Sequence, residues 1–255
     1  MIKLLLDVDT GIDDALALFY LAHAQKKGEI EILGSTTVGG NVEVGQTTLN
    51  TLKIWEILDL DIPVASGAKQ PLMVPLNPAP FVHGDDGLGN TFLPAPKKLP
   101  SEESAAEMIL RLSHEYAGEL TLLTTAPLTN IAVALLQDPS LAKRICKVVI
   151  MGGAVFTGNV SAVAEANIAN DPEAARIVFR SGMDMTLIGL DVTHEVYWEE
   201  QDLQDLVKIA NGRSAFLLKI IDFISTAYES LTGWKRCVLH DPLAAGVCLF
   251  PDLVK

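Results

Sequence analysis

Short, continuously apolar runs alternate along this chain with segments of helical periodicity, and this alternation limits the folds that it can adopt. The apolar runs cover residues 2–8, 32–38, 63–67, 120–125, 148–152 and 185–190. Helical patterns follow them, over residues 13–25, 44–58, 101–116, 128–137, 172–181 and 213–229. Strands without polar alternation are buried on both faces. We therefore predict an α/β fold: a Rossmann-like open, mainly parallel sheet with helices on both faces.

One proline- and glycine-rich stretch, residues 71–100, keeps neither helical nor strand periodicity. We interpret it as one long functional loop, because loops of this length in compact domains usually cover sites. No linker, composition break or internal repeat divides the chain, so we expect a single domain over residues 1–255. In such α/β sheets, ligands bind beyond the carboxyl ends of the strands. Polar residues at those ends are the candidates for a site.

Charge and composition exclude several classes of protein. With 19 Lys and Arg against 32 Asp and Glu, the formal charge is −13, and no basic patch offsets it. We therefore expect no nucleic-acid partner. No apolar run reaches about 18 uncharged residues and no signal-peptide core is present, so we expect no membrane association and a soluble, cytoplasmic protein. Cys146, Cys237 and Cys248 have no paired-ligand spacing, and we expect three buried thiols.

Four carboxylates crowd the end of the first apolar run. Asp7 and Asp9 share one face of the expected strand, and Gly11 allows a tight turn that brings Asp13 and Asp14 into the first helical turn. Capping a helix needs one or two acids, so four indicate a positively charged ligand. Oxygen ligands without thiols or clustered imidazoles favour a hard cation, Ca²⁺ or Mg²⁺.

The acidic block resembles the N-terminal signature of the inosine-uridine preferring nucleoside hydrolases, with Thr10 in place of that family's usual proline. Further blocks match in the same order: TVGGN at 37–41, TAPLTN at 125–130, MGG at 151–153, GN at 158–159, EAN at 165–167, DPEAA at 171–175 and HDPLA at 240–244. The resemblance implies the nucleoside hydrolase fold and hydrolysis of the N-glycosidic bond of ribonucleosides to free base and ribose. It also implies a part in purine or pyrimidine salvage and a homodimer or homotetramer.

The same resemblance implies one Ca²⁺ ion. Its ligands would be the carboxylates of Asp9, Asp14 and Asp241 and the main-chain carbonyl of Thr125. Such an ion lowers the pKa of a bound water, and a neighbouring carboxylate can take the proton. The resemblance assigns that role of general base to Asp9.

Substrate contacts are likewise implied by the resemblance. Met151 would line the apolar face of the sugar. The side chains expected around the ribose hydroxyls are Asp13, Asn41, Asn159, Glu165 and Asn167. Taken singly, each asparagine also fits a loop turn, and only the joint match to the family order indicates a ribose site.

Protonation of the leaving base calls for a group that titrates near neutrality, and His240, directly before Asp241, fits that need. It matches a histidine implicated as an acid in several members of the family. His83, in a glycine-rich loop, is a second candidate beside the base, because mobile lids often close over a substrate. We expect His23, His114 and His194 to be structural. Phe223 and Tyr228 lie on a helix whose family counterpart contacts the base, although core packing is the commoner role for such aromatics.

Two departures from the family pattern concern the pocket and the chain length. Ala166 stands where many members have phenylalanine, which removes a wall of the pocket and leaves purine or pyrimidine preference and tolerance of deoxyribose open. Relatives usually continue further, so we expect residues 1–255 to lack the C-terminal elements of longer relatives.

Two other functions remain open on the sequence. A haloacid-dehalogenase-like, Mg²⁺-dependent phosphatase would use Asp7 as nucleophile. Gly11 and the adjacent pair of Asp13 and Asp14 depart from the pattern of that class. A catalytically inactive, calcium-stabilised nucleoside-binding protein would bind nucleosides without releasing free base.

Overall fold

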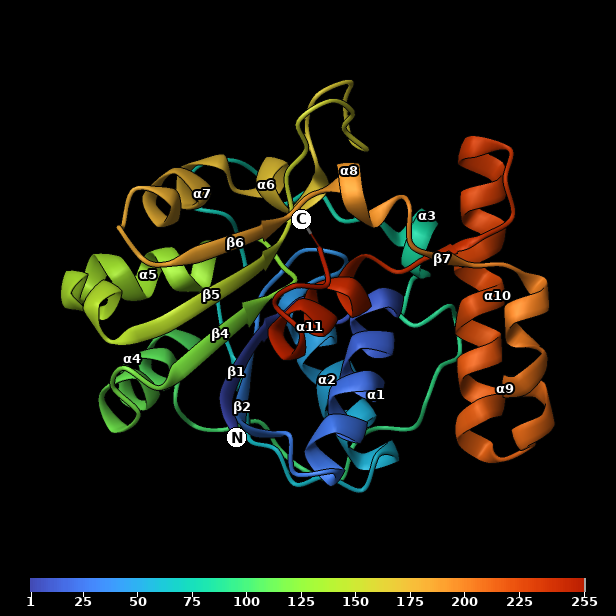
Figure 1. The fold of residues 1–255 in the computed structure, drawn as a ribbon, viewed down its shortest axis with the longest axis horizontal. Helices are drawn as coiled ribbons and strands as arrows, with labels where there is room; N and C mark the ends of the chain where they lie inside the picture. The colour runs from blue at the N-terminus through green and yellow to red at the C-terminus, as the bar shows by residue number, and fades with distance from the viewer. Residues whose placement is uncertain (255) are drawn as a thin grey trace.

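Six parallel strands form the centre of the protein (Figure 1). The computed structural model describes residues 1–254 and orders the strands β3-β2-β1-β4-β5-β6. Their bounds are β1 Ile2–Val8, β2 Ile30–Thr37, β3 Val64–Ser66, β4 Leu120–Thr124, β5 Ile145–Met151 and β6 Met185–Ile188. The predicted parallel sheet is confirmed, and all six predicted strands form, with ends that differ by up to three residues.

The order of the strands reverses at the centre of the sheet. The chain builds outward from β1 to β3, and then returns to the other side of β1 and builds outward from β4 to β6. Asp7 of β1 and Thr124 of β4 are register partners, so the segments that follow them leave the sheet side by side. A crevice at such a reversal is where α/β sheets bind ligands.

Helices cover both faces of the sheet, as Figure 1 shows. One face carries α1 (Ile12–Lys26), α2 (Val44–Ile57), α10 (Gly212–Thr232) and α11 (His240–Leu249). The other carries α4 (Ala105–Glu115), α5 (Thr129–Gln137) and α7 (Pro172–Phe179). Along β1, Leu4 and Leu6 pack into the first core and Leu5 into the second. Both faces of the strand are therefore buried, which explains its unbroken apolar sequence.

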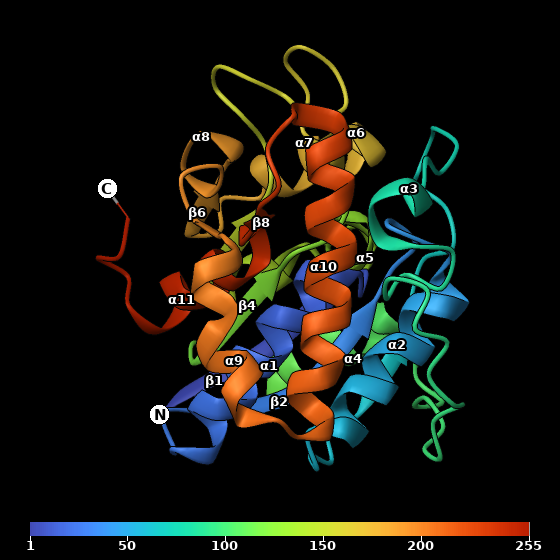
Figure 2. The ribbon, with the colours of Figure 1, turned by 90° about the vertical axis from the view of Figure 1, so that its right-hand side faces the viewer.

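Several short elements have no periodicity from which they could be predicted. These are α3 (Pro80–His83), α6 (Ala166–Asn170), α8 (Leu190–Thr193), α9 (Gln204–Ile209), the 3₁₀ turns η1 (Pro139–Lys143) and η2 (Glu200–Leu203), and a small antiparallel pair, β7 (Tyr197–Trp198) and β8 (Cys237–Val238). Because α3 lies inside the stretch 71–100, the interpretation of that stretch as one loop is wrong there. Figure 2 shows α10 running along the outside of the sheet with α9 beside it.

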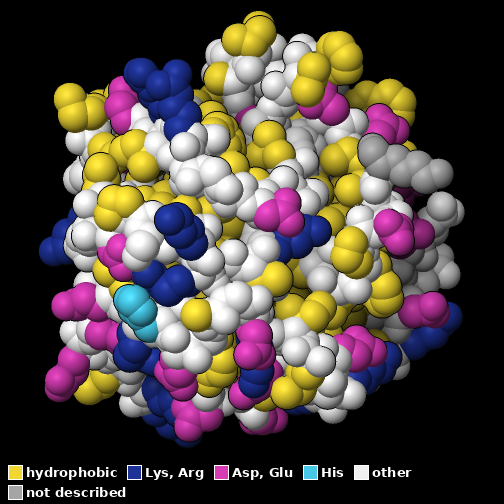
Figure 3. Space-filling view, turned by 60° about the vertical axis from the view of Figure 1, so that its left-hand side comes forward, with side chains coloured by type: hydrophobic (Ala, Val, Ile, Leu, Met, Phe, Trp, Pro, Cys, Tyr) yellow, Lys and Arg dark blue, Asp and Glu magenta, His cyan; other side chains and the backbone are white. Residues whose placement is uncertain are grey.

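The surface carries charged side chains of both signs. Lys and Arg side chains are interspersed with Asp and Glu on the face drawn in Figure 3, and apolar side chains project at its top. Within residues 1–254, no helix combines the length and the apolar character that a membrane crossing needs. Cys237 and Cys248 are buried, but Cys146 is exposed. The expectation of three buried thiols is wrong at Cys146, because it lies at the start of β5, before the strand becomes fully buried.

Candidate active site

The segment after β1 and the first turns of α1 and α11 bring four carboxylates together. We call Asp9, Asp13, Asp14 and Asp241 the acidic cluster. Carboxylate oxygens of Asp13, Asp14 and Asp241 lie within 4.8 Å of one another, although Asp241 is far away in sequence. Asp14 is held on two sides, by the backbone N–H of Gly11 at 2.9 Å and by the hydroxyl of Thr125 at 2.7 Å. The fold therefore brings the carboxylate oxygens of Asp13, Asp14 and Asp241 close to one another.

Asp9 is held through only one of its two oxygens. Its Oδ2 accepts the backbone N–H of Asn41 at 2.7 Å, whereas its Oδ1 is buried and has no hydrogen-bond partner among the described residues. Gly40 permits this close approach, since a Cβ at that position would lie 1.9 Å from Asp9 Oδ2. A buried carboxylate oxygen without a donor is costly, and it is an available ligand atom for a cation.

Burial and mutual repulsion disfavour the charged forms of the acidic cluster. Burial raises the pKa of Asp13 to about 6 and, together with the charge of Asp13, raises the pKa of Asp14 to about 7. Burial and the neighbouring carboxylates also hold the pKa values of Asp9 and Asp241 well above their usual range. Among residues 1–254, His83 is the one basic side chain within 4 Å of a carboxylate of the cluster, with Nδ1 3.8 Å from Asp13 Oδ1, and its lowered pKa leaves the ring uncharged at pH 7. The donor set therefore fits a hard cation such as Ca²⁺ or Mg²⁺.

The predicted metal ligands and the converging carboxylates overlap without being identical. Asp14 and Asp241 belong to both sets. Asp13, expected at the ribose, joins them, whereas Asp9 lies outside the group of three that meets within 4.8 Å. The carbonyl of Thr125 accepts a hydrogen bond from Asn167 Nδ2 at 3.0 Å.

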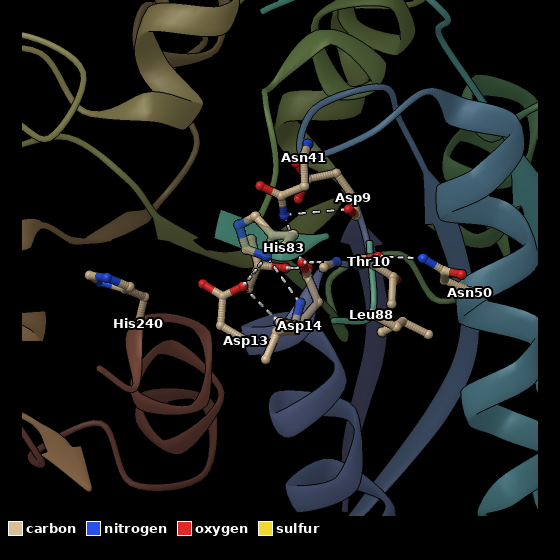
Figure 4. Close-up of polar contacts among 12 residues, drawn as sticks. Asp9, Thr10, Asp13, Asp14, Asn41, Asn50, His83, Leu88 and His240 are labelled. Atoms are coloured by element: carbon tan, nitrogen blue, oxygen red, sulfur yellow. Dashed lines mark hydrogen bonds and ion pairs between the residues drawn. The ribbon is translucent and has the colours of Figure 1, made fainter. Parts of the chain in front are cut away.

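His83 lies directly against the first turn of α1, as Figure 4 shows. Its Nδ1 accepts the backbone N–H of Ile12 at 3.2 Å, which leaves the ring proton of the neutral form on Nε2. Burial lowers the pKa of His83 to about 4, so the ring is neutral at pH 7. Gly11 makes room for it, because a Cβ there would lie 2.5 Å from His83 Nδ1. Asn41 lies above the same turn, with Nδ2 3.3 Å from Asp14 Oδ2.

The residues expected at the ribose divide into two groups. Met151, Glu165 and Asn167 are buried near the ends of β4 and β5. Glu165 caps α6 and accepts three backbone N–H groups at 2.9 to 3.1 Å, while Asn167 Nδ2 donates to the carbonyl of Met151 at 3.2 Å. Asn159 is exposed, and its Oδ1 accepts the backbone N–H of Ala166 at 2.9 Å. These polar groups hold the loop 152–165 in place.

His240 is the first residue of α11 and is hydrogen-bonded through both ring nitrogens. Nε2 lies 2.5 Å from the hydroxyl of Tyr228 on α10, and Nδ1 lies 2.7 Å from Oγ1 of Thr193 on α8. We call these three residues the His240 network. The ring of His194 packs edge-on against His240, with centroids 5.6 Å apart. In Figure 4, His240 lies across from Asp13, away from His83.

One sequence expectation about this network is wrong, and another is incomplete. Burial lowers the pKa of His240 to about 3, so it does not titrate near neutrality in this environment. Tyr228 packs against the core, as expected for such an aromatic residue, and its hydroxyl is also hydrogen-bonded to His240. The sequence gives no signal for Thr193, because it lies 47 positions from His240 and no spacing rule joins them.

Asp7 does not suit the phosphatase alternative. Its side chain is fully buried, and its Oδ1 accepts hydrogen bonds from Thr36 Oγ1 at 2.6 Å and Asn130 Nδ2 at 2.7 Å. A nucleophile must reach its substrate. The placement of Asp7 as a phosphatase nucleophile is therefore wrong, because the fold puts the carboxylate inside the sheet.

Comparison with known proteins agrees with the motif order along the chain. Residues 4–255 match the family model described as inosine-uridine preferring nucleoside hydrolase. Uridine nucleosidase 1 of Arabidopsis thaliana is 42% identical over 98% of this chain and 75% of its own length. Among solved structures, a plant nucleoside hydrolase has a TM-score of 0.94 at 36% identity, covering 99% of this chain and 80% of its own. A purine-preferring ribonucleoside hydrolase from Gardnerella vaginalis has a TM-score of 0.94 at 37% identity, covering 99% and 81%.

Proposed function

The chain belongs to the inosine-uridine preferring nucleoside hydrolase family, and from this premise we propose that it hydrolyses ribonucleosides to free base and ribose in a Ca²⁺-dependent reaction. Family membership makes the chain a hydrolase of nucleoside N-glycosidic bonds. The cation and the residue roles are the proposed part.

One observation carries the proposal for the cation. Three carboxylates from opposite ends of the chain meet within 4.8 Å, and the neighbouring Asp9 has a buried oxygen without a donor. Four buried acids with raised pKa values destabilise one another unless positive charge is supplied. Asp9, Asp14, Asp241 and the carbonyl of Thr125 are the proposed ligands, with Asp13 beside them. When bound, Ca²⁺ supplies the charge that acidifies a water molecule and holds hydroxyl groups.

The general base and the contacts to the sugar are assigned to residues around the acidic cluster. Asp9 is the proposed general base on the strength of the family resemblance, since its carboxylate would lie beside a water held by the cation and could take its proton. Asp13 and Asn41 face the same turn and are proposed to bind ribose hydroxyls, with Asn159, Glu165 and Asn167 on the loop side. Met151, which is buried, is proposed to pack against the apolar face of the sugar.

The departing base takes the bonding electron pair and needs a proton or a hydrogen-bond donor. His240 is proposed to serve this need together with Tyr228, whose hydroxyl is hydrogen-bonded to its Nε2. Because both groups are neutral at pH 7, one proton lies in the hydrogen bond between Nε2 and the Tyr228 oxygen, and with the ring proton on Nε2 the Tyr228 O–H is the neutral donor that remains for the base. His83, with its proton on Nε2, is proposed as a second contact to the base.

The test is release of free base and reducing sugar from inosine and from uridine, with and without a calcium chelator. Both substrates are needed, because one relative is named for uridine and another for purines. We expect release that stops with chelator and returns on addition of Ca²⁺. Release that persists after the protein is shown to be metal-free would contradict the proposed cation.

Assembly and location are further proposals from the family resemblance. We propose that residues 1–255 act as one domain, that the protein is a homodimer or homotetramer, and that it works in nucleoside salvage in the cytoplasm. Light scattering on the purified chain tests the assembly, and a monomer at micromolar concentration would contradict it.

A further inference from the structure

Helix α8 is fixed to the loop on the ribose side of the site. The backbone N–H of Leu190 donates to the carbonyl of Gly153 at 2.9 Å. The carboxylate of Asp191 accepts the backbone N–H groups of Val155 and Phe156 at 2.6 and 3.0 Å. These contacts hold a helix of only four residues in a defined place beside His240.

Thr193 ends this helix with its side chain fully buried. Its backbone N–H is used within the turn, since it donates to the carbonyl of Gly189 at 3.1 Å. Among residues 1–254, its hydroxyl has one hydrogen-bond partner, Nδ1 of His240 at 2.7 Å. A buried hydroxyl is costly without a partner, so the pair is mutually dependent.

The chemistry of a hydroxyl suits this position. A hydroxyl can donate to a bare ring nitrogen or accept from a protonated one by rotating about its C–O bond. A carboxylate would accept only and would favour a charged ring, whereas valine could do neither. Because Nδ1 is the single partner of this buried hydroxyl among the described residues, donation to a bare Nδ1 leaves no O–H proton unsatisfied, and this arrangement favours the ring proton on Nε2.

From this geometry we propose that Thr193 is a positioning residue for His240: it holds the imidazole plane and engages Nδ1, so that Nε2 binds the Tyr228 oxygen and the Tyr228 O–H is presented to the leaving base. The proposal rests on the proposed function, because it assumes that His240 serves the leaving group. Thr193 does not touch the substrate in this role. It acts through the ring of His240, and the edge-on contact of His194 supports the same orientation.

The experiment compares Thr193→Val, which keeps the shape and removes the hydroxyl, with Thr193→Ser, which keeps the hydroxyl. Steady-state kcat and KM are measured on inosine and on p-nitrophenyl riboside, whose leaving group needs little protonation. For Thr193→Val we expect kcat on inosine to fall on the order of 10-fold or more, KM to stay within about threefold, and the nitrophenyl substrate to change little. Thr193→Ser is expected to retain most of the inosine activity.

Asp191→Asn is the matched control on the same helix. It weakens the anchor of α8 on the loop and leaves the Thr193 hydroxyl in place. We expect any loss that it causes to be equal for the two substrates, because it loosens the ribose side rather than the base side. Equal losses for Thr193→Val would mean that this residue also acts only by supporting the fold, and would overturn the proposal.

A second readout does not require activity. Nitrogen-15 NMR of the imidazole groups, with the His240 signals assigned from His240→Ala, reports which ring nitrogen carries the proton. We expect one tautomer in the wild type and in Thr193→Ser, and a mixture in Thr193→Val. Unchanged signals in Thr193→Val would overturn the proposal. If the wild type hydrolyses no nucleoside, the proposed function fails, and the NMR comparison still decides whether Thr193 orients His240.

Discussion

The acidic cluster and the His240 network lie on two sides of the same site and differ in how far the protein alone satisfies them. In the acidic cluster, Asp9 Oδ1 has no donor among the described residues, and the pKa values of all four acids are raised. In the His240 network, both ring nitrogens are hydrogen-bonded and the ring is neutral. The acidic cluster therefore needs an added positive charge, whereas the ring nitrogens of His240 already have hydrogen-bond partners within the protein.

This difference separates two ways of preparing a site. The acidic cluster stores electrostatic repulsion that a cation can relieve, so its stability and its activity depend on that cation. The His240 network is oriented in advance by hydrogen bonds from two further elements, so its contribution depends on geometry. Substitutions in the two regions are therefore expected to have different consequences.

The largest effect is expected for Asp9→Ala. It removes a proposed ligand and the proposed base together, so we expect tightly bound Ca²⁺ to be lost and kcat to fall by at least about 10³-fold. Bound calcium is measured by atomic emission after gel filtration, and turnover by release of free base. Asp61→Ala, an exposed acid paired with Lys98, is the control and should change neither. If Asp9→Ala kept both bound calcium and turnover, Asp9 would be neither a ligand nor the base, and the acidic cluster would not depend on a cation in the way proposed.

His240→Ala is expected to act on the leaving group and not on the metal. Turnover of inosine should fall about 10²-fold, p-nitrophenyl riboside should be affected far less, and bound calcium should be unchanged. His114→Ala, an exposed histidine, is the control. If both substrates slowed equally, His240 would have no special role toward the base.

Gly40→Ala tests how the backbone positions Asp9. A Cβ 1.9 Å from Asp9 Oδ2 must displace that carboxylate, so we expect calcium affinity to fall about 10- to 100-fold, in the range seen when groups that orient ligands are changed. Gly45→Ala is the matched control, since a Cβ there meets nothing within 4 Å. Titration of the metal-free protein by calorimetry gives both affinities. Equal calcium affinities in the two variants would show that calcium binding does not depend on the present position of the Asp9 carboxylate.

Asp241→Asn should stabilise the metal-free protein at neutral pH. Because the folded-state pKa values of Asp13 and Asp14 are raised to about 6 and about 7, the folded state binds more protons than the unfolded state between about pH 4 and pH 7, and stability falls as pH rises through that window. The pKa of Asp241 is itself held well above its usual range by burial and by the neighbouring carboxylates, so replacing this acid with a neutral amide removes a group that is unfavourable to fold in its charged form, and the variant should be more stable at pH 7.

Thermal unfolding with and without calcium measures this effect. The gain of Asp241→Asn over the wild type should disappear near pH 4, where the acids are protonated in both proteins. Calcium should stabilise the wild type at pH 7 and have little effect on the variant. A variant that is less stable than the wild type at pH 7 without metal would show that repulsion does not dominate the acidic cluster.

The sequence predicted the acidic side of the site better than the other side. Asp9, Asp13 and Asp14 are close together along the chain, at the end of a recognisable strand, so their proximity follows from local geometry. Asp241 could be added only through the ordered family motifs. The pairing of His240 with Thr193 and Tyr228 joins three elements, one of them a helix too short to show periodicity, and no local pattern reports such a contact.

The sequence by itself determined the parallel sheet, its two helical layers and the crowding of acids after the first strand, because apolar continuity and residue order are local properties. Only the tertiary structure decided which groups are charged and which oxygen atoms have partners. Burial gives His240 a pKa of about 3 and raises those of the acidic cluster, and burial depends on what the rest of the chain packs against each side chain.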